Sequence, residues 1–248
     1  MLNGKIGLIN KTQNNELYVR LSDVEKEITA FYEYNQDAFR DKTVLLPCDD
    51  PKKSNFTKFF AKNFEKFGLK KLISTSPAFG YSYKTNYYQN SFLEKKSDYY
   101  ILNINKSKGK IFAIDRDTYV SGLFEVGEPE WLFLEGDGDF RSDEIVKFRD
   151  EADIIITYPP CSLIKKFLFW IYEADKKFIV IADKACLKDE DISSLIENNK
   201  IWFGKTDCGD GFWFETTYYN DFDKSKSKTD MEKIDAVWLT NIEYGNHQ

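Results

Sequence analysis

Three short turns contain the side chains that are best suited to chemistry, and each follows a stretch that is typical of a strand. They read Cys48-Asp49-Asp50-Pro51, Gly136-Asp137-Gly138-Asp139 and Tyr158-Pro159-Pro160-Cys161. Carboxylates at the ends of strands can bind hydroxyls and amines, whereas two prolines fix the backbone and leave carbonyl oxygens that no strand pairing uses. These turns could bind a polar ligand, although Asp-Gly pairs and prolines are also common as plain turns and strand ends.

One ligand that fits the acidic turns is S-adenosylmethionine (SAM). Carboxylates can accept hydrogen bonds from its ribose hydroxyls and its amino group, and its sulfonium is a cation. The chain has neither a GxGxxG fingerprint nor a GxxxxGK[ST] loop, so the sequence disfavours chemistry on nucleotide phosphates. The residue types suit SAM but do not select it by themselves.

The cysteines and the histidine disfavour several other chemistries. The cysteines are Cys48, Cys161, Cys186 and Cys208, without a CxxC pair, and the only histidine is His247. We therefore expect no zinc site and no Ser-His-Asp or Cys-His mechanism. The sequence has no apolar run long enough to span a membrane and no signal-peptide core, so we expect a cytoplasmic protein with reduced thiols, no metal and no membrane partner.

Composition sets limits on the partner. The 248 residues have a formal charge of −6, and 17% of them are aromatic. Such a chain is expected to fold, most simply as a single domain over residues 1–248. The acidic balance argues against a large nucleic-acid footprint. Lysines cluster at 52–71 and 95–110, but such clusters are more often solvated helix faces than binding surfaces.

The turns can act together only if the strands before them share a sheet. Apolar patterning predicts strands at 43–47, 70–75, 131–135, 153–157 and 177–182, and helices at 22–34, 54–67, 142–152, 162–172 and 189–198. Ser22 and Glu25 form a capping-box pattern, and Ser54 can cap the next helix. This alternation predicts an α/β fold with a mostly parallel, doubly wound sheet. Parallel strands end at one edge, where such folds bind ligands, so all three turns are expected there.

The remaining segments have weaker patterns. Residues 76–130 contain alternating runs at 99–104 and 110–114, which predict an antiparallel hairpin inserted into the α/β frame. The pattern of the C-terminal part predicts two strands at the edge of the sheet, at 212–218 and 236–240. Between them it predicts a mobile charged loop at 221–233.

Blocks of residues from about Asn15 to Asn246 match one known family in order. Besides the three turns, they lie at 21–27, 31–35, 54–56, 67–73, 151–154, 176–178 and 199–204. Through these blocks the sequence resembles the EcoRI-type adenine-specific DNA methyltransferases. The resemblance implies a Rossmann-like SAM-dependent methyltransferase fold, with SAM as the methyl donor and DNA as the partner.

The resemblance also implies roles for individual residues. The cofactor would be bound by Cys48, Asp49, Asp50, Pro51, Asn55, Asp137 and Asp139. The catalytic turn would be Tyr158, Pro159, Pro160 and Cys161, which would receive a flipped adenine. In the family this turn usually reads Asn-Pro-Pro-Phe. The asparagine and proline carbonyl oxygens accept hydrogen bonds from the adenine N6 amine, and the aromatic ring stacks on the base.

This chain departs from the family at both ends of that turn, where it has Tyr158 and Cys161. Three interpretations follow. The chain is an active adenine-N6 methyltransferase with an unusual motif. Alternatively, it is a catalytically impaired SAM-binding relative that acts as a binding or regulatory protein, for example in a phage or against restriction. The third interpretation is a SAM enzyme with another substrate.

Overall fold

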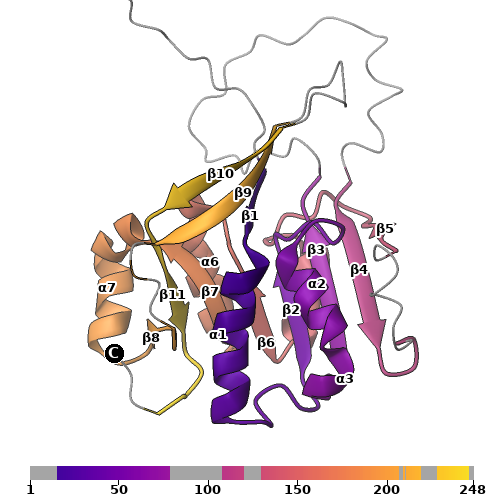
Figure 1. Cartoon of the computed structure of the whole chain (residues 1–248), viewed down its shortest axis with the longest axis horizontal. Helices are drawn as coiled ribbons and strands as arrows, with labels where there is room; N and C mark the ends of the chain where they lie inside the picture. Colours follow the sequence, from indigo (N-terminus) through magenta and orange to yellow (C-terminus); the bar gives the residue numbers. More distant parts are fainter. Residues whose placement is uncertain are drawn as a thin grey trace, which may run out of the picture.

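The computed structural model describes residues 16–78, 108–119, 130–206, 209, 211–218 and 228–245. Its centre is an eight-stranded sheet with the order β5-β4-β3-β2-β6-β7-β11-β8 (Figure 1). The strands are β2 Thr43–Pro47, β3 Lys71–Ser76, β4 Lys110–Asp115, β5 Leu132–Phe133, β6 Ile154–Thr157, β7 Lys177–Asp183, β8 Trp202–Phe203 and β11 Ala236–Thr240. The predicted strands are therefore present and share one sheet, although β5 is a short edge strand with exposed Leu132 and Phe133.

The sheet is mixed rather than mostly parallel. The central strands β3, β2, β6 and β7 are parallel neighbours. In contrast, β4 runs antiparallel to both β3 and β5, and β11 runs antiparallel to both β7 and β8. Because β4 reverses the direction once and β5 reverses it again, β5 points the same way as β2 and β3. The turn after β5 therefore lies at the same edge as the turns after β2 and β6.

Helices cover both faces of this sheet (Figure 1). One face carries α1 Leu21–Tyr34, α2 Asn55–Lys62 and α3 Phe64–Phe67, and the other carries α5 Asp143–Glu151, α6 Ile164–Glu173 and α7 Glu190–Glu197. Strand alternation explains the two layers, because Val44 and Leu46 pack with the first group of helices and Leu45 packs with the second. None of the helices in the described ranges has the length and apolar character of a membrane span.

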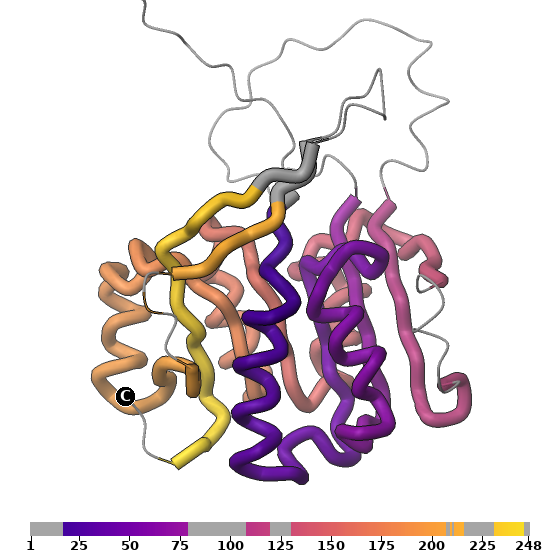
Figure 2. Tube along the Cα trace, viewed as in Figure 1, coloured from indigo at the N-terminus to yellow at the C-terminus, as the bar shows by residue number. Residues whose placement is uncertain are grey.

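A second, three-stranded antiparallel sheet has the order β1-β9-β10, with β1 Glu16–Val19, β9 Phe212–Tyr218 and β10 Lys228–Ile234. Figure 2 shows the N-terminal strand rising to meet the two later strands. The prediction of β9 at the edge of the main sheet is wrong. Buried Phe212 and Phe214 turn β9 toward the core, where the Phe212 ring lies 5.3 Å from that of Trp238.

Two further predictions are wrong for local reasons. Of the predicted loop at 221–233, residues 228–233 belong to the strand β10, because a solvated edge strand can be as charged as a loop, and residues 221–227 lie outside the described residues. Ser22 does not cap α1, which begins one residue earlier, after Arg20. The Arg20 side chain instead pairs with Asp23 in the first turn, at 3.0 Å.

Other predictions are confirmed or lie outside the described residues. Ser54 caps α2 by accepting the amides of Phe56 and Thr57, and Gly68 ends α3 with a φ of 61°. Short 3-10 turns, Cys161–Leu163 and Lys184–Lys188, precede α6 and α7. Of the predicted hairpin, the run at 110–114 forms β4 beside β3, whereas the run at 99–104 is outside the described residues.

A buried carboxylate joins α1 to the segment after β8. Glu27 accepts hydrogen bonds from the amides of Lys205 and Thr206, at 2.7 Å and 2.8 Å, and from the Thr206 hydroxyl. Burial raises the pKa of Glu27, and the three donors oppose that shift only in part. This carboxylate fixes the position of the β8 segment on the helical layer.

Candidate functional site

The centre of the sheet contains a topological switch point. The chain leaves β2 toward β3 on one side and returns to β6 on the other side of β2. Open α/β sheets bind ligands outside the carboxyl ends of strands at such a point. The turns after β2 and β6 meet there, because the Thr157 hydroxyl at the end of β6 lies 2.7 Å from Oδ2 of Asp49.

Asp49 is buried at the base of this crevice. Its Oδ1 accepts a hydrogen bond from the Ser54 hydroxyl at 2.9 Å, and its Oδ2 contacts Thr157. Burial raises the pKa of Asp49 to about 7, because the charged form is poorly solvated there and the two hydroxyls compensate only in part. Both oxygens of this carboxyl are thus occupied by groups of the protein.

The next residue, Asp50, forms the main ion pair of the site. Its Oδ2 lies 2.5 Å from Nζ of Lys110 on β4, and its Oδ1 accepts the amide of Lys52. The same ammonium lies 4.9 Å from the centre of the Trp131 ring. Lys110 could not be recognised as part of the site from the sequence, because nothing in a strand pattern tells which residue lies across the sheet.

The other predicted residues of this turn have structural contacts. Cys48 adopts a left-handed backbone with a φ of 68°, which directs the Asp49 amide to the carbonyl of Thr75 at 2.9 Å. Pro51 is buried in the turn. The Asn55 side-chain amide donates to the carbonyl of Val19 at 2.8 Å, so this residue joins α2 to the strand β1.

The turn after β5 contributes Asp137 and Asp139. The amide of Ala78, after β3, donates to the carbonyl of Asp137 at 2.8 Å, which brings this turn to the same edge. Asp139 is buried and pairs with the guanidinium of Arg141, whose Nε lies 2.9 Å from Oδ1. Asp137 is half-buried, and its Oδ1 accepts the amide of Asp139. Gly138, with a φ of 76°, packs so closely that a Cβ would lie 2.5 Å from the Ser76 carbonyl oxygen.

Two buried hydroxyls lie at the end of β3. Oγ1 of Thr75 and Oγ of Ser76 have no hydrogen-bond partner among the described residues. Buried polar atoms without a partner are unfavourable by about 1–3 kcal/mol each, so they suit a place where a polar ligand binds. A Ser-Thr-Ser run in a strand does not reveal this from sequence, because most such hydroxyls bond within the protein.

The turn after β6 is held by its own side chains. The Tyr158 hydroxyl lies 3.4 Å from Sγ of Cys161, and the Tyr158 ring packs against Phe214 of β9 with centroids 4.7 Å apart. Burial raises the pKa of Tyr158, so its hydroxyl keeps its proton. The carbonyl of Pro160 accepts the Leu163 amide at 2.8 Å. The acceptors that this turn can offer include the Tyr158 hydroxyl and the Pro159 carbonyl.

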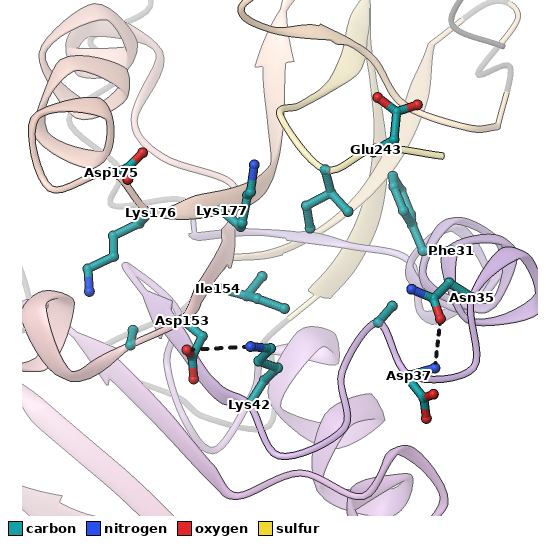
Figure 3. Close-up of a pocket in the computed structure, with 13 residues that line it drawn as sticks. Phe31, Asn35, Asp37, Lys42, Asp153, Ile154, Asp175, Lys176, Lys177 and Glu243 are labelled. Carbon is teal, nitrogen blue, oxygen red and sulfur yellow. Dashed lines mark hydrogen bonds and ion pairs between the residues drawn. The ribbon is translucent and has the colours of Figure 1, made fainter. Parts of the chain in front are cut away.

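A cavity of about 500 Å³ opens at the opposite edge of the sheet (Figure 3). It lies at the amino ends of β2 and β6, between Phe31, Lys42 and Asp153. Lys42 and Asp153 pair across it at 3.8 Å. It contains none of the three turns and therefore belongs to no part of the site. The described residues also contain no cluster of three His, Cys, Asp or Glu side chains that could bind a metal ion.

Comparison with known proteins identifies the family. The family model described as adenine-specific methyltransferase EcoRI matches residues 6–248. The chain belongs to this family. It is 36% identical to the type II methyltransferase M.EcoRI of Escherichia coli over 78% of the chain and 53% of that protein.

Two relatives from mycoplasmas are more distant. The chain is 30% identical to M.MgeORF184P of Mycoplasma genitalium and to M.MpnI of Mycoplasma pneumoniae, each over 79% of the chain and 49% of the relative. The chain thus spans about half the length of the curated relatives that it matches. No solved structure matches it significantly.

Proposed function

We propose that the chain is a SAM-dependent DNA adenine-N6 methyltransferase with a Rossmann-like fold, in which residues 76–130 form an insertion in a single domain. The observation that carries this proposal is the contact between Thr157 and Asp49, in a chain of this family. This contact joins an acidic turn to a proline turn at the switch point of the sheet. A cofactor and an acceptor base can therefore lie side by side.

The acidic side of the crevice fits SAM. Asp137 is half-buried and bound by one amide, so it can accept hydrogen bonds from ribose hydroxyls or from the adenine amine of the cofactor. The hydroxyls of Thr75 and Ser76 can bond the polar edge of the same ligand. When bound, SAM supplies the methyl group on a positively charged sulfur. Asp50 and Lys110 neutralise each other, which limits repulsion of that charge.

The proline turn fits the acceptor amine. The Tyr158 hydroxyl can donate its proton to Sγ of Cys161, which leaves the oxygen lone pairs free to accept from the amine of a flipped adenine. The Pro159 carbonyl can accept the second N–H. Two acceptors localise the nitrogen lone pair toward the methyl group, which is the task of asparagine and proline in the usual motif. Phe214 holds the tyrosine ring in place.

Methyl transfer tests the proposal directly. The purified chain should transfer labelled methyl from SAM to DNA that contains adenine, and not to a duplex of only guanine and cytosine. The label should be recovered as N6-methyladenine. Absence of transfer to either duplex, with SAM binding retained in calorimetry, would contradict the proposed reaction. The two other interpretations, an impaired SAM-binding relative and a SAM enzyme with another substrate, would then remain.

The second candidate, a SAM-binding relative with little activity, is favoured by one observation. Cys161 is exposed and has no ring to stack on a base. Restoring the family's side chains by Tyr158→Asn with Cys161→Phe should then raise transfer to DNA from a low wild-type level. A wild-type rate that exceeds that of the double variant would support the active enzyme with an unusual motif.

A further inference from the structure

Asp49 lies at a junction of several elements. Its backbone joins β2 to β3, because its amide donates to the Thr75 carbonyl and its carbonyl accepts from the Ser74 hydroxyl at 3.2 Å. Its side chain joins the cap of α2, through Ser54, to the end of β6, through Thr157. Thr157 directly precedes the proline turn, so Asp49 holds the base of that turn.

A count of protons indicates the state of this carboxyl. The Thr157 hydroxyl has one proton but lies within hydrogen-bond distance of two acceptors, Oδ2 of Asp49 and the carbonyl of Pro47. An ionised Asp49 would leave one of these contacts as two oxygens without a proton between them. A neutral Asp49 donates from Oδ2 to Thr157, which then donates to Pro47, while Ser54 donates to Oδ1. Every contact is then satisfied.

The charged groups around Asp49 favour the same state. The neighbouring Asp50 repels a negative charge, and Lys110 of β4, which could have compensated, is paired with Asp50. The described side chains that contact Asp49 from α2 and β6 are the hydroxyls of Ser54 and Thr157. From β3, the hydroxyl of Ser74 contacts the Asp49 carbonyl. Two further titratable groups are close in sequence: Cys48 precedes Asp49, and Tyr158 follows its partner Thr157.

We propose that Asp49, as a neutral carboxylic acid, is a positioning residue that holds the proline turn against the turn after β2. Ionisation removes the proton that Thr157 accepts, so the carboxylate and the Pro47 carbonyl then compete for one hydroxyl. The turn is therefore held less firmly above the pKa of Asp49. The assignment of this turn to an acceptor base rests on the proposed function, but the role of the proton does not.

Asparagine is a close mimic of the neutral acid. In Asp49→Asn, the amide oxygen can accept from Ser54 and the amide nitrogen can donate to Thr157, at any pH. Asp49→Ala removes both contacts, and Thr157→Val removes the hydroxyl while it keeps the shape of the side chain. Asp139→Asn is a matched control, because Asp139 is a buried aspartate whose partner is the cation Arg141.

Amide hydrogen exchange of residues 154–163, measured without SAM or DNA at pH 6.0 and 8.5, tests the proposal. Protection relative to the unfolded chain should fall at least about fivefold in the wild type at the higher pH and stay constant in Asp49→Asn. It should be low at both pH values in Asp49→Ala and Thr157→Val. In the Asp49 and Thr157 variants, the protection of α7 (Glu190–Glu197) should equal that in the wild type at each pH. In Asp139→Asn, the protection of the turn should depend on pH as it does in the wild type.

Two outcomes would overturn the proposal: equal loss of protection in Asp49→Asn and Asp49→Ala at pH 6.0, or a wild-type turn that is insensitive to pH. Methylation assays separate this result from the proposed function. If the turn positions the acceptor, Thr157→Val should lower kcat at least tenfold and change the KM for SAM less than threefold. A wild-type chain without methyl transfer would refute the proposed reaction, while the exchange pattern would still decide the role of Asp49.

Discussion

Replacing Asp49 by asparagine is expected to change how the stability of the chain depends on pH, because it removes a proton that the buried carboxyl binds more tightly in the folded state. Burial raises the pKa of Asp49 from 3.8 to about 7. Between these values the folded chain holds a proton that the unfolded chain has released. The free energy of unfolding therefore decreases as the pH rises through this window, and it levels off above the folded pKa.

The magnitude follows from the width of the window. A shift of about 3 pH units corresponds to about 4 kcal/mol, at about 1.4 kcal/mol per unit. Part of this is already lost at pH 5, so between pH 5 and pH 8 the group should account for a loss of about 2–3 kcal/mol. The asparagine variant lacks this loss. Burial of the second N–H of the asparagine amide can lower the free energy of unfolding by about 1 kcal/mol, but by the same amount at every pH.

Urea unfolding at pH 5 and pH 8 measures the effect, with the tryptophans as a fluorescent signal. Glu27, whose pKa is also raised by burial, is present in both proteins, so its contribution cancels in the comparison. Asp139→Asn should be less stable by about 1–3 kcal/mol at both pH values, because it removes the charge of a buried carboxylate that pairs with the exposed guanidinium of Arg141. Parallel pH profiles for the wild type and Asp49→Asn would refute the neutral acid.

Three other substitutions test separate parts of the structure. Tyr158→Phe keeps the ring but removes the hydroxyl, and it should lower the rate of methyl transfer to DNA by roughly 10²–10³-fold, whereas an unchanged rate would exclude that hydroxyl as an acceptor. Glu27→Ala removes a buried acceptor of three hydrogen bonds and should lower the free energy of unfolding in urea by about 3 kcal/mol or more, a loss that a Gln substitution should partly restore. Gly138→Ala should destabilise the chain by more than about 2 kcal/mol and weaken SAM binding in calorimetry, since its Cβ would meet the Ser76 carbonyl. Gly209→Ala, where a Cβ would have no described atom within 4 Å, is the control, and a similar loss there would contradict the explanation by close packing at Gly138.

The sequence predicted the central strands well because their chemistry is local. A buried parallel strand reads as a short apolar run, and Ile154–Thr157 and Thr43–Pro47 contain little else. The turns that follow them are equally visible, since prolines and paired acids stand out against such runs. The meeting of the turns at one edge depended on strand direction, and it holds because β4 reverses the chain between β3 and β5.

The second sheet could not be predicted in the same way. Four of the seven residues of β10 are Lys, Asp or Glu, a composition typical of a loop, and its pairing with β9 gives it strand structure. A pairing between distant segments leaves no mark within either of them. For the same reason the sequence could not show that Phe214 supports Tyr158 or that Lys110 pairs with Asp50. Such contacts depend on tertiary packing and not on local propensity.

The contacts of Tyr158 also decide how its departure from the family motif must be tested. The phenol fills space beside Phe214 and bonds to Cys161, so the two unusual residues of the motif contact each other. A single Tyr158→Asn change would leave a gap beside Phe214 and an unpartnered thiol. A loss of activity there would report poor packing and not a poor acceptor. The double substitution with Cys161→Phe returns volume to the same region. Only the comparison of the single and double variants therefore separates a decayed motif from one that has been rebuilt around a hydroxyl.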